Sequence, residues 1–231
     1  LASDIQETGL NVGFLSAGGC PPVPNLLDDL HPDCFGIIDV FNSVLSFEDK
    51  IKIVVVSGCF NCYLIEQSQS DRAPGDKYNY YYLSADKRLY LREGKGKEES
   101  LAGLSKFLES LSLKYKLVFI GDNPLSENFD PTVIMSYKIR GDSSFFKERY
   151  TGFKDNEFNV SEEQLVIDDQ LRKITPSNAN YVSLIDIVCP NKICKATNNQ
   201  EHPIYKDGNH MRPDFVKEFV GPNLLKYLKL D

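Results

Sequence analysis

The sequence contains no run of about 18 apolar residues, the length that a membrane-spanning helix requires, so no part of it is predicted to cross a bilayer. It also has no excess of basic residues. The formal net charge of −7 argues against a nucleic-acid partner, because binding to a phosphate backbone requires a basic surface. The 42% hydrophobic and 26% charged residues are typical of a globular protein, and 231 residues suffice for a sizeable core.

The start of the sequence lacks the basic head and the apolar core of a signal peptide, and it has no initiator methionine. Residues 1–9 instead have the character of the middle of a helix. We therefore expect the chain to have been cut from a longer protein.

Short apolar runs without alternation predict buried parallel strands, and apolar residues at helical spacing predict helices between them. The predicted strands are Asn11–Ala17, Lys52–Ser57, Lys116–Gly121 and Tyr181–Val188. The predicted helices cover Phe35–Leu45, Leu101–Leu111, Ser161–Leu171 and a last segment from Pro213, interrupted at Gly221-Pro222. This alternation predicts an α/β fold, a three-layer α/β/α sandwich around a parallel sheet.

One tyrosine-rich segment breaks the alternation. Residues 78–92 predict a β-hairpin that turns at Ser84–Lys87. Its tyrosines could line a glycan site, although aromatic residues also simply favour strands. Since no repeat or linker is visible, residues 1–231 are predicted to form a single domain.

The six cysteines fall into three close pairs, for which nearest-neighbour disulfides are the simplest prediction. Such pairing would indicate an oxidising compartment. A redox dithiol or half of a zinc site remains open for the Cys-x-x-Cys pair. The pairs are Cys20 with Cys34, Cys59 with Cys62, and Cys189 with Cys194.

Chemistry is most clearly indicated by Asp207 and His210, which precede the last predicted helix. A carboxylate at this spacing can hold one imidazole nitrogen while the other faces a nucleophile. Turn formation or a helix cap is the competing interpretation, because Asp-Gly-Asn is also good turn chemistry. Of the three histidines, His31 is expected to be a surface residue and His202 to be structural, and His210 alone is assigned a carboxylate at useful spacing.

Four blocks in order carry a family resemblance: Phe14–Pro22, Ile53–Ser57, Ile187–Cys194 and Pro203–His210. With them the chain resembles the SGNH domain fused to membrane acyltransferases of the acyltransferase-3 family. The resemblance implies an SGNH or flavodoxin-like sandwich without its first strand. It also implies an extracytoplasmic, periplasmic domain tethered to the inner membrane in the parent protein.

The family resemblance implies transfer of an acyl group, with acetyl as the expected group, to a hydroxyl of a cell-surface glycan such as the O-antigen of lipopolysaccharide. The partners implied are the glycan acceptor and an acyl donor relayed by the membrane domain, with no metal and no cofactor. Asp207 and His210 would be the acid–base pair, and Gly19 and Asn61 the oxyanion-hole donors. Asn123 is a rival to Asn61, because Gly58-Cys-Phe-Asn61 departs from the family's Gly-x-Asn-Asp block.

The Gly-Asp-Ser block that carries the family's nucleophile is absent from the sequence. We expect it in a segment upstream of Leu1, within about 30 residues, the length of a strand and a helix. The alternatives are a non-catalytic glycan-binding or scaffold module that has lost the serine, a secreted carbohydrate esterase, and a thiol oxidoreductase that uses Cys59 and Cys62.

Overall fold

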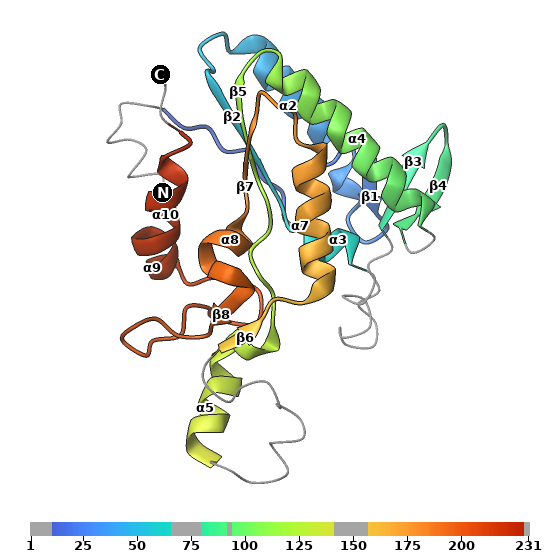
Figure 1. The fold of residues 1–231 in the computed structure, drawn as a ribbon. Coiled ribbons are helices and arrows are strands. Elements are labelled where there is room, and N and C mark those ends of the chain that lie inside the picture. Colours follow the sequence, from blue (N-terminus) through green and yellow to red (C-terminus); the bar gives the residue numbers. More distant parts are fainter. Residues whose placement is uncertain (1–10, 66–79, 92–93, 141–156, 229–231) are drawn as a thin grey trace. The chain divides into compact units, whose positions relative to one another are not determined.

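The computed structural model describes residues 11–65, 80–91, 94–140 and 157–228 (Figure 1). The chain divides into two compact units. The sheet unit consists of the described residues of Asn11–Asp122 and Val166–Val182, and the histidine unit of those of Asn123–Leu165 and Ser183–Asp231. Each unit is described by itself. Among the described residues, none of the helices is both long and apolar enough to cross a membrane.

The sheet unit contains most of the regular structure. Its elements are β1 (Leu26–Asp28), η1 (Pro32–Cys34), α2 (Ile37–Phe47), β2 (Ile53–Ser57), α3 (Phe60–Leu64), β3 (Tyr80–Ser84), β4 (Lys87–Tyr90), α4 (Lys95–Ser112), β5 (Lys116–Ile120) and β7 (Asn180–Val182). The larger part of α7 (Glu162–Ile174) belongs to the same unit.

The histidine unit is built from short elements. They are η4 (Glu127–Phe129), α5 (Pro131–Arg140), β6 (Glu157–Asn159), α8 (Leu184–Val188), η5 (Pro190–Lys192), β8 (Ile193–Lys195), α9 (Pro213–Phe215), the π-helical turn η6 (Val216–Val220) and α10 (Gly221–Leu225).

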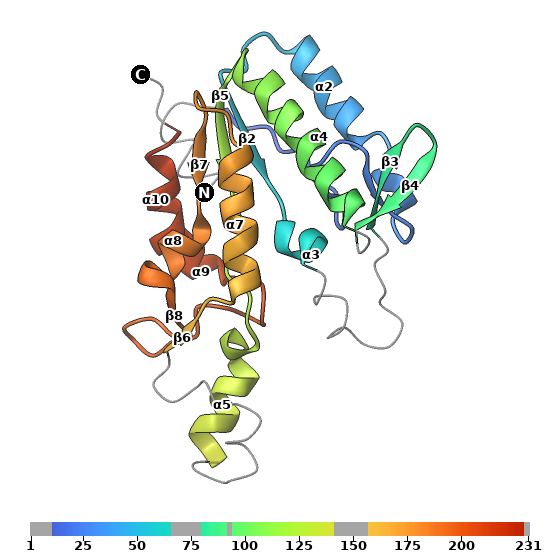
Figure 2. The ribbon, with the colours of Figure 1, turned by 45° about the vertical axis from the view of Figure 1, so that its right-hand side comes forward.

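A three-stranded parallel sheet in the order β2-β5-β7 is the centre of the sheet unit. Successive side chains of a strand point to opposite faces. On one face Val54 and Val56 join Leu117 and Phe119 in a core with apolar residues of α2, α4 and α7. Both ribbon views show α2 and α4 side by side over this sheet (Figures 1 and 2). The fold is therefore mixed α/β with a parallel sheet flanked by helices, as the alternating pattern predicts.

The tyrosine-rich segment forms the predicted hairpin, with β3 and β4 joined at Ala85-Asp86 in left-handed conformation. Residues 78, 79 and 92 of the predicted hairpin lie outside the described residues. The structure adds β1, which pairs with β3 in a three-stranded antiparallel sheet. Tyr80 and Tyr81 are buried, so packing accounts for these two aromatic side chains.

The core of the histidine unit is aromatic. Tyr205 is fully buried and stacks on Phe129 with ring centroids 3.9 Å apart. Phe158 packs edge-on against Phe129. Phe158 lies on β6, which pairs with β8 in a two-stranded antiparallel sheet. This core supports the chain immediately before Asp207.

All six cysteines are in disulfides, which join Cys20 to Cys34, Cys59 to Cys62 and Cys189 to Cys194. These are the three nearest-neighbour pairs. Each crosslink closes a short loop, of 14, 3 and 5 residues in sequence separation. Three disulfides are consistent with an extracytoplasmic domain, because disulfides persist in oxidising compartments.

Two predicted strands are wrong. Asn11–Ala17 is exposed and forms no strand within the described residues. Tyr181–Val188 is divided, because the hydroxyl of Ser183 accepts a hydrogen bond from the Asp186 N–H and starts α8.

The terminal helix is not interrupted at Gly221-Pro222 as the sequence predicts. The Gly221 N–H bonds to the oxygen of Val216, five residues back, in the π-helical turn η6. Pro222 occupies the first turn of α10, where a missing N–H costs no helical hydrogen bond. The expectation of a helix over residues 1–9 lies outside the described residues.

Candidate functional site

Asp207 and His210 meet in one loop of the histidine unit. The His210 Nδ1 atom lies 2.9 Å from Oδ2 and 3.0 Å from Oδ1 of Asp207. The side chain of His210 is 62% exposed and that of Asp207 is 44% exposed. A carboxylate on Nδ1 orients the ring and leaves Nε2 as the atom that can take a proton from a hydroxyl. The pair has the geometry of an acid–base couple open to solvent.

The carboxylate of Asp207 also builds the turn that carries the histidine. Its Oδ1 accepts hydrogen bonds from the N–H groups of Asn209, at 3.0 Å, and His210, at 2.8 Å. Partial burial raises the pKa of Asp207. The two N–H groups and the imidazole lower this pKa by more, so that it is below its ordinary value. Asp207 therefore forms a turn and also pairs with His210. It does not cap the last helix, because α9 begins only at Pro213.

The segment after β5 fixes this loop from the side. The Asn123 side-chain N–H donates to the backbone oxygen of Asn209 at 2.9 Å and to the hydroxyl of Tyr205 at 3.2 Å. The Ser126 N–H donates to the oxygen of Gly208 at 3.0 Å. The buried Tyr205 hydroxyl donates to the oxygen of Pro124 at 2.8 Å. Asn123, considered from sequence as an oxyanion donor, therefore uses its amide to hold the histidine loop.

Gly208 lies close to the backbone of the Ser126 segment. A Cβ atom there would lie 3.2 Å from the backbone oxygen of Ser126, which is tighter than ordinary van der Waals contact. A larger residue here would require the loop or the Ser126 segment to shift by a few tenths of an ångström.

A second Asp-x-x-His pair lies in the sheet unit, and the sequence analysis missed it. His31 Nδ1 is 2.7 Å from Oδ2 of Asp28, whose side chain is fully buried, whereas that of His31 is 35% exposed. The statement that only His210 has a carboxylate at useful spacing is therefore wrong. The spacing of Asp28 and His31 was the signal that could have revealed this pair.

The imidazole of His31 packs directly against Gly19, one of the two predicted oxyanion donors. Gly19 has a φ of 77°, and a Cβ atom there would lie 2.9 Å from His31 Nε2. The neighbouring Cys20 is crosslinked to Cys34. Asp28 thus anchors a histidine that supports the Gly19 loop, which is a structural role for His31.

Asn61, the other predicted oxyanion donor, is buried in α3. Its backbone N–H donates to Oδ2 of Asp122 at 2.5 Å. Both polar atoms of its side chain are buried and have no hydrogen-bond partner in the described part of the chain. An unsatisfied buried amide costs about 1–3 kcal/mol, so this side chain requires a group that would satisfy it.

The predicted site residues are distributed over both units. The structure brings Asp207 and His210 together in the histidine unit. Gly19 and Asn61 belong to the sheet unit, where they lie on separate segments. Among the described residues, no hydrogen bond joins a serine hydroxyl to His210.

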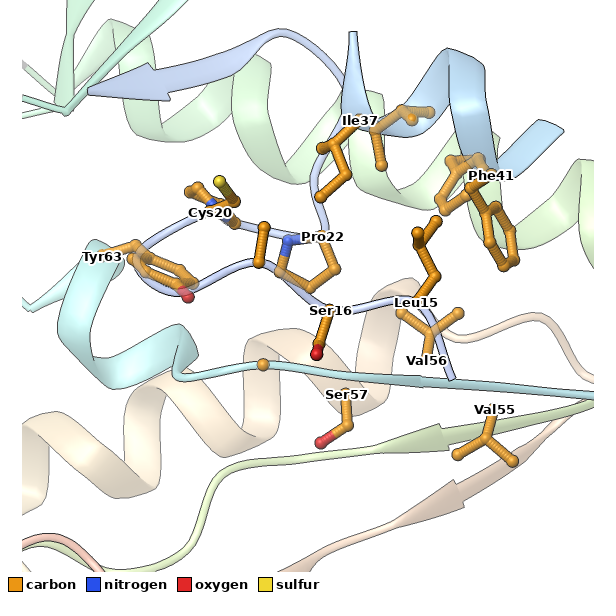
Figure 3. A pocket seen from close by; sticks show the side chains of 15 residues that line it. Leu15, Ser16, Cys20, Pro22, Ile37, Phe41, Val55, Val56, Ser57 and Tyr63 are labelled. Atoms are coloured by element: carbon orange, nitrogen blue, oxygen red, sulfur yellow. The ribbon is translucent and has the colours of Figure 1, made fainter. Parts of the chain in front are cut away.

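A cavity of about 250 Å³ lies within the sheet unit, beside β2 (Figure 3). Its walls are mainly apolar, and its polar groups include the hydroxyls of Ser16, Ser57 and Tyr63. Burial raises the pKa of Tyr63 to about 12, so this hydroxyl stays neutral at physiological pH. Figure 3 shows the side chain of Ser16 pointing from its segment toward β2, whereas that of Ser57 lies on the other side of β2, as does Val55.

Comparison with known families gives one match. The model of the SGNH domain fused to AT3 (acyltransferase-3) domains matches residues 1–221. No curated protein matches the chain. The matched region includes both Asp-x-x-His pairs, Gly19 and Asn61.

Proposed function

The chain belongs to the SGNH domains that are fused to acyltransferase-3 domains, and from this premise we propose that it transfers an acetyl group to a hydroxyl of a cell-surface glycan such as lipopolysaccharide O-antigen. The family itself implies a role in acyl transfer. The observation that carries the proposal is the contact of 2.9 Å between His210 Nδ1 and Asp207, on a loop held by Asn123. The acyl donor is relayed from the membrane acyltransferase domain of the same parent protein.

The reaction proceeds in two steps on a serine supplied by a segment upstream of Leu1. His210 Nε2 takes the serine proton while the serine oxygen bonds to the acyl carbon, and Asp207 stabilises the imidazolium that forms. The donor's leaving group departs with that proton. A sugar hydroxyl then attacks the acyl-enzyme, gives its proton to His210, and the serine is regenerated.

The oxyanion of each tetrahedral intermediate requires preorganised donors. We assign the Gly19 N–H and the Asn61 side-chain amide to this role. The support for Asn61 is its buried amide without a partner in the described residues, and the support for Gly19 is the backbone conformation fixed by His31. In the complete protein these residues, Asp207 and His210 belong to one domain with a three-layer α/β/α architecture.

The domain acts outside the cytoplasm, in the periplasm, tethered to the inner membrane by its fused acyltransferase part. Three disulfides support an oxidising compartment. The acceptor is then a glycan on the outer side of that membrane. The exposed imidazole of His210 is accessible to such a glycan.

A non-catalytic glycan-binding module is the second candidate. The observation that favours it is the lack, in the described residues, of a serine hydroxyl bonded to His210. A secreted carbohydrate esterase is the third, and it differs by releasing the acyl group to water rather than to a sugar.

The test uses the natural polypeptide extended upstream of Leu1, assayed for release of acetate from a chromogenic acetyl ester. We expect His210→Ala to lower kcat by about 10³-fold or more, because removal of a triad member has effects of this size. His202→Ala is the control, since it removes another exposed imidazole of the histidine unit, outside the proposed site, and should leave kcat within about twofold. Equal activity of His210→Ala and the natural sequence contradicts the proposal. Adding a glycan acceptor and measuring its acetylation separates transferase from esterase.

A further inference from the structure

The Gly19 N–H lies in a turn that its two glycines allow to adopt either of two forms. The turn is closed by the Cys20 N–H, which donates to the Ala17 oxygen at 3.2 Å. Gly19 is the third residue of this turn and has a φ of 77°, where a type II turn requires about +80° and a type I turn about −90°. Glycine adopts either sign of φ readily. The two forms differ by a rotation of the peptide between Gly18 and Gly19, so they point the Gly19 N–H in opposite directions.

The flat face of the His31 ring lies against Gly19. A Cβ atom on Gly19 would be 2.9 Å from Nε2, 3.0 Å from Cε1 and 3.1 Å from Cδ2 of His31. An approach to Nε2 in the plane of the ring would leave both carbons clearly farther away than the nitrogen. The ring therefore covers one side of Gly19, and this contact favours the turn form that the structure shows.

The carboxylate of Asp28 fixes the ring in this place. Its side chain is fully buried, with Oδ2 at 2.7 Å from His31 Nδ1, and its Oδ1 accepts the Leu30 N–H at 3.1 Å. A hydrogen bond to a buried carboxylate is strong, because it is charge-assisted and water does not compete for it. Asp28 is the last residue of β1, which is paired with β3. The ring is thus attached to the end of a paired strand.

A disulfide holds the same turn at a different point. Cys20, which follows Gly19, is crosslinked to Cys34 in η1, and the Cys34 N–H donates to the His31 oxygen at 3.1 Å. The crosslink fixes where the turn ends. It does not fix the peptide between Gly18 and Gly19, which can rotate while Cys20 stays in place. The His31 ring is the group that contacts Gly19 itself.

The Gly19 N–H is available to a substrate. Gly19 is exposed, and among the described residues no acceptor is bonded to its N–H. An oxyanion is stabilised by donors that already point at it, because no reorganisation is then required during the reaction. Rotation of the peptide would turn this N–H away. The form of the turn therefore decides whether Gly19 can act as a donor.

We infer that His31 is a positioning residue for acyl transfer: its ring, held by Asp28, selects the turn form in which the Gly19 N–H faces the oxyanion. It does so by contact and exchanges no proton. The role in acyl transfer rests on the proposed function, whereas the control of the turn does not. The two Asp-x-x-His pairs then use the same bond for different ends, since Asp207 prepares Nε2 of His210 for chemistry and Asp28 fixes where the His31 ring lies.

His31→Asn in the full parent protein is the first test. The asparagine NH₂ group can donate to Asp28 from the place of Nδ1, so the buried carboxylate stays paired, but the atoms Nε2 and Cε1 that cover Gly19 are removed. We expect kcat for the chromogenic acetyl ester to fall by about 10- to 100-fold with KM within about twofold. The reason is that loss of a whole oxyanion donor costs about 10²–10³ in kcat and affects only the transition state. His202→Ala, which removes an exposed imidazole of the histidine unit, is the control and should change neither constant.

Asp28→Asn distinguishes positioning from proton transfer. The Leu30 N–H and the imidazole contact different oxygens of Asp28, so an asparagine can accept the first and donate to Nδ1 of the second. The ring then stays on Gly19, although its proton moves to Nε2. We expect kcat to fall by about two- to fivefold, against about 10⁴-fold for Asp207→Asn. A loss as large as that of Asp207→Asn would show that His31 exchanges a proton and would overturn the inference.

Hydrogen exchange on the same full parent protein tests the turn without reference to activity. In His31→Asn the amide of Cys20 should exchange about tenfold faster than in the natural protein, while the amides of Lys116–Ile120 keep their rates. Should fast exchange of the Lys116–Ile120 amides show that this variant does not fold, His31→Gln, whose amide also reaches Asp28, takes its place with the same expected results.

Unchanged exchange at Cys20 in the folded variant, or an unchanged kcat, contradicts the inference. Faster exchange at Cys20 in a protein whose activity does not depend on His210 would refute the proposed function and leave the control of the turn intact.

Discussion

Replacing Asp207 by asparagine separates the two roles that the carboxylate has in the histidine loop. The turn N–H groups of Asn209 and His210 both bond to Oδ1, so an asparagine oxygen can still accept them. The second oxygen, 2.9 Å from His210 Nδ1, becomes an NH₂ group that can only donate. Nδ1 then faces a donor at its shorter contact, which favours the tautomer with the ring proton on Nε2, and that tautomer cannot take a proton from a hydroxyl at Nε2.

The structure predicts a small effect of Asp207→Asn on stability and a large one on activity. With the two side chains 62% and 44% exposed, the pair contributes about 0–1 kcal/mol to folding. The same replacement in a Ser-His-Asp triad lowers kcat by about 10⁴-fold, which is roughly 5.5 kcal/mol in the activation barrier. The expected ratio of the two effects is therefore at least fivefold.

The measurement is the chromogenic ester assay on the polypeptide extended upstream of Leu1, with urea unfolding of the same samples. Asp214→Asn is the control, because it removes another exposed carboxylate, paired with Arg212, outside the loop. It should leave kcat unchanged. A loss of less than tenfold in kcat for Asp207→Asn, or a destabilisation above about 2 kcal/mol, would show that the carboxylate only builds the turn.

Three further predictions follow from the contacts described. Asn123→Ala removes the donor to the Asn209 oxygen, so we expect about a tenfold lower kcat and faster amide exchange at Asn209. The Tm should fall by only a few degrees. Unchanged exchange at Asn209 would contradict the hydrogen bond by which Asn123 holds the loop. Gly121→Ala places a Cβ 2.2 Å from the Tyr181 hydroxyl and should destabilise by about 3 kcal/mol in urea, whereas a neutral effect would refute this packing. Because the folded pKa of Asp207 is below its unfolded value of about 3.9, its stabilising contribution is full above that value and is lost as pH falls through the folded pKa. Natural protein and Asp207→Asn should therefore differ in unfolding free energy at pH 6 and converge once the pH falls below the folded pKa of Asp207.

The sequence predicts the elements whose pattern is determined by the core. Ile53–Ser57 and Lys116–Ile120 are buried at alternate or at nearly all positions and form strands where apolar runs predict them. The run Asn11–Ala17 has the same apolar character but forms no ladder among the described residues. Composition shows that a segment can be a strand, but pairing depends on a neighbour that a single segment does not reveal.

The candidate site was predicted in part for a similar reason. Spacing alone places Asp207 on the same turn as His210, because a carboxylate three residues before a histidine can reach its ring. The same spacing at Asp28 and His31 gives a pair with a buried carboxylate. The hydrogen bond from the Asn123 side chain to the Asn209 oxygen joins residues 86 positions apart, and no local pattern predicts a contact of that range.

Two imidazoles with the same chemical partner but different solvent access have a consequence for reagents that acylate histidine. Diethyl pyrocarbonate reacts with neutral, accessible imidazole, so the ring that is 62% exposed should be carbethoxylated before the one that is 35% exposed and packed on Gly19. Inactivation should follow the first, faster phase of modification. Histidine footprinting would then distinguish the catalytic imidazole of His210 from that of His31, which supports a loop, without any substitution in the chain.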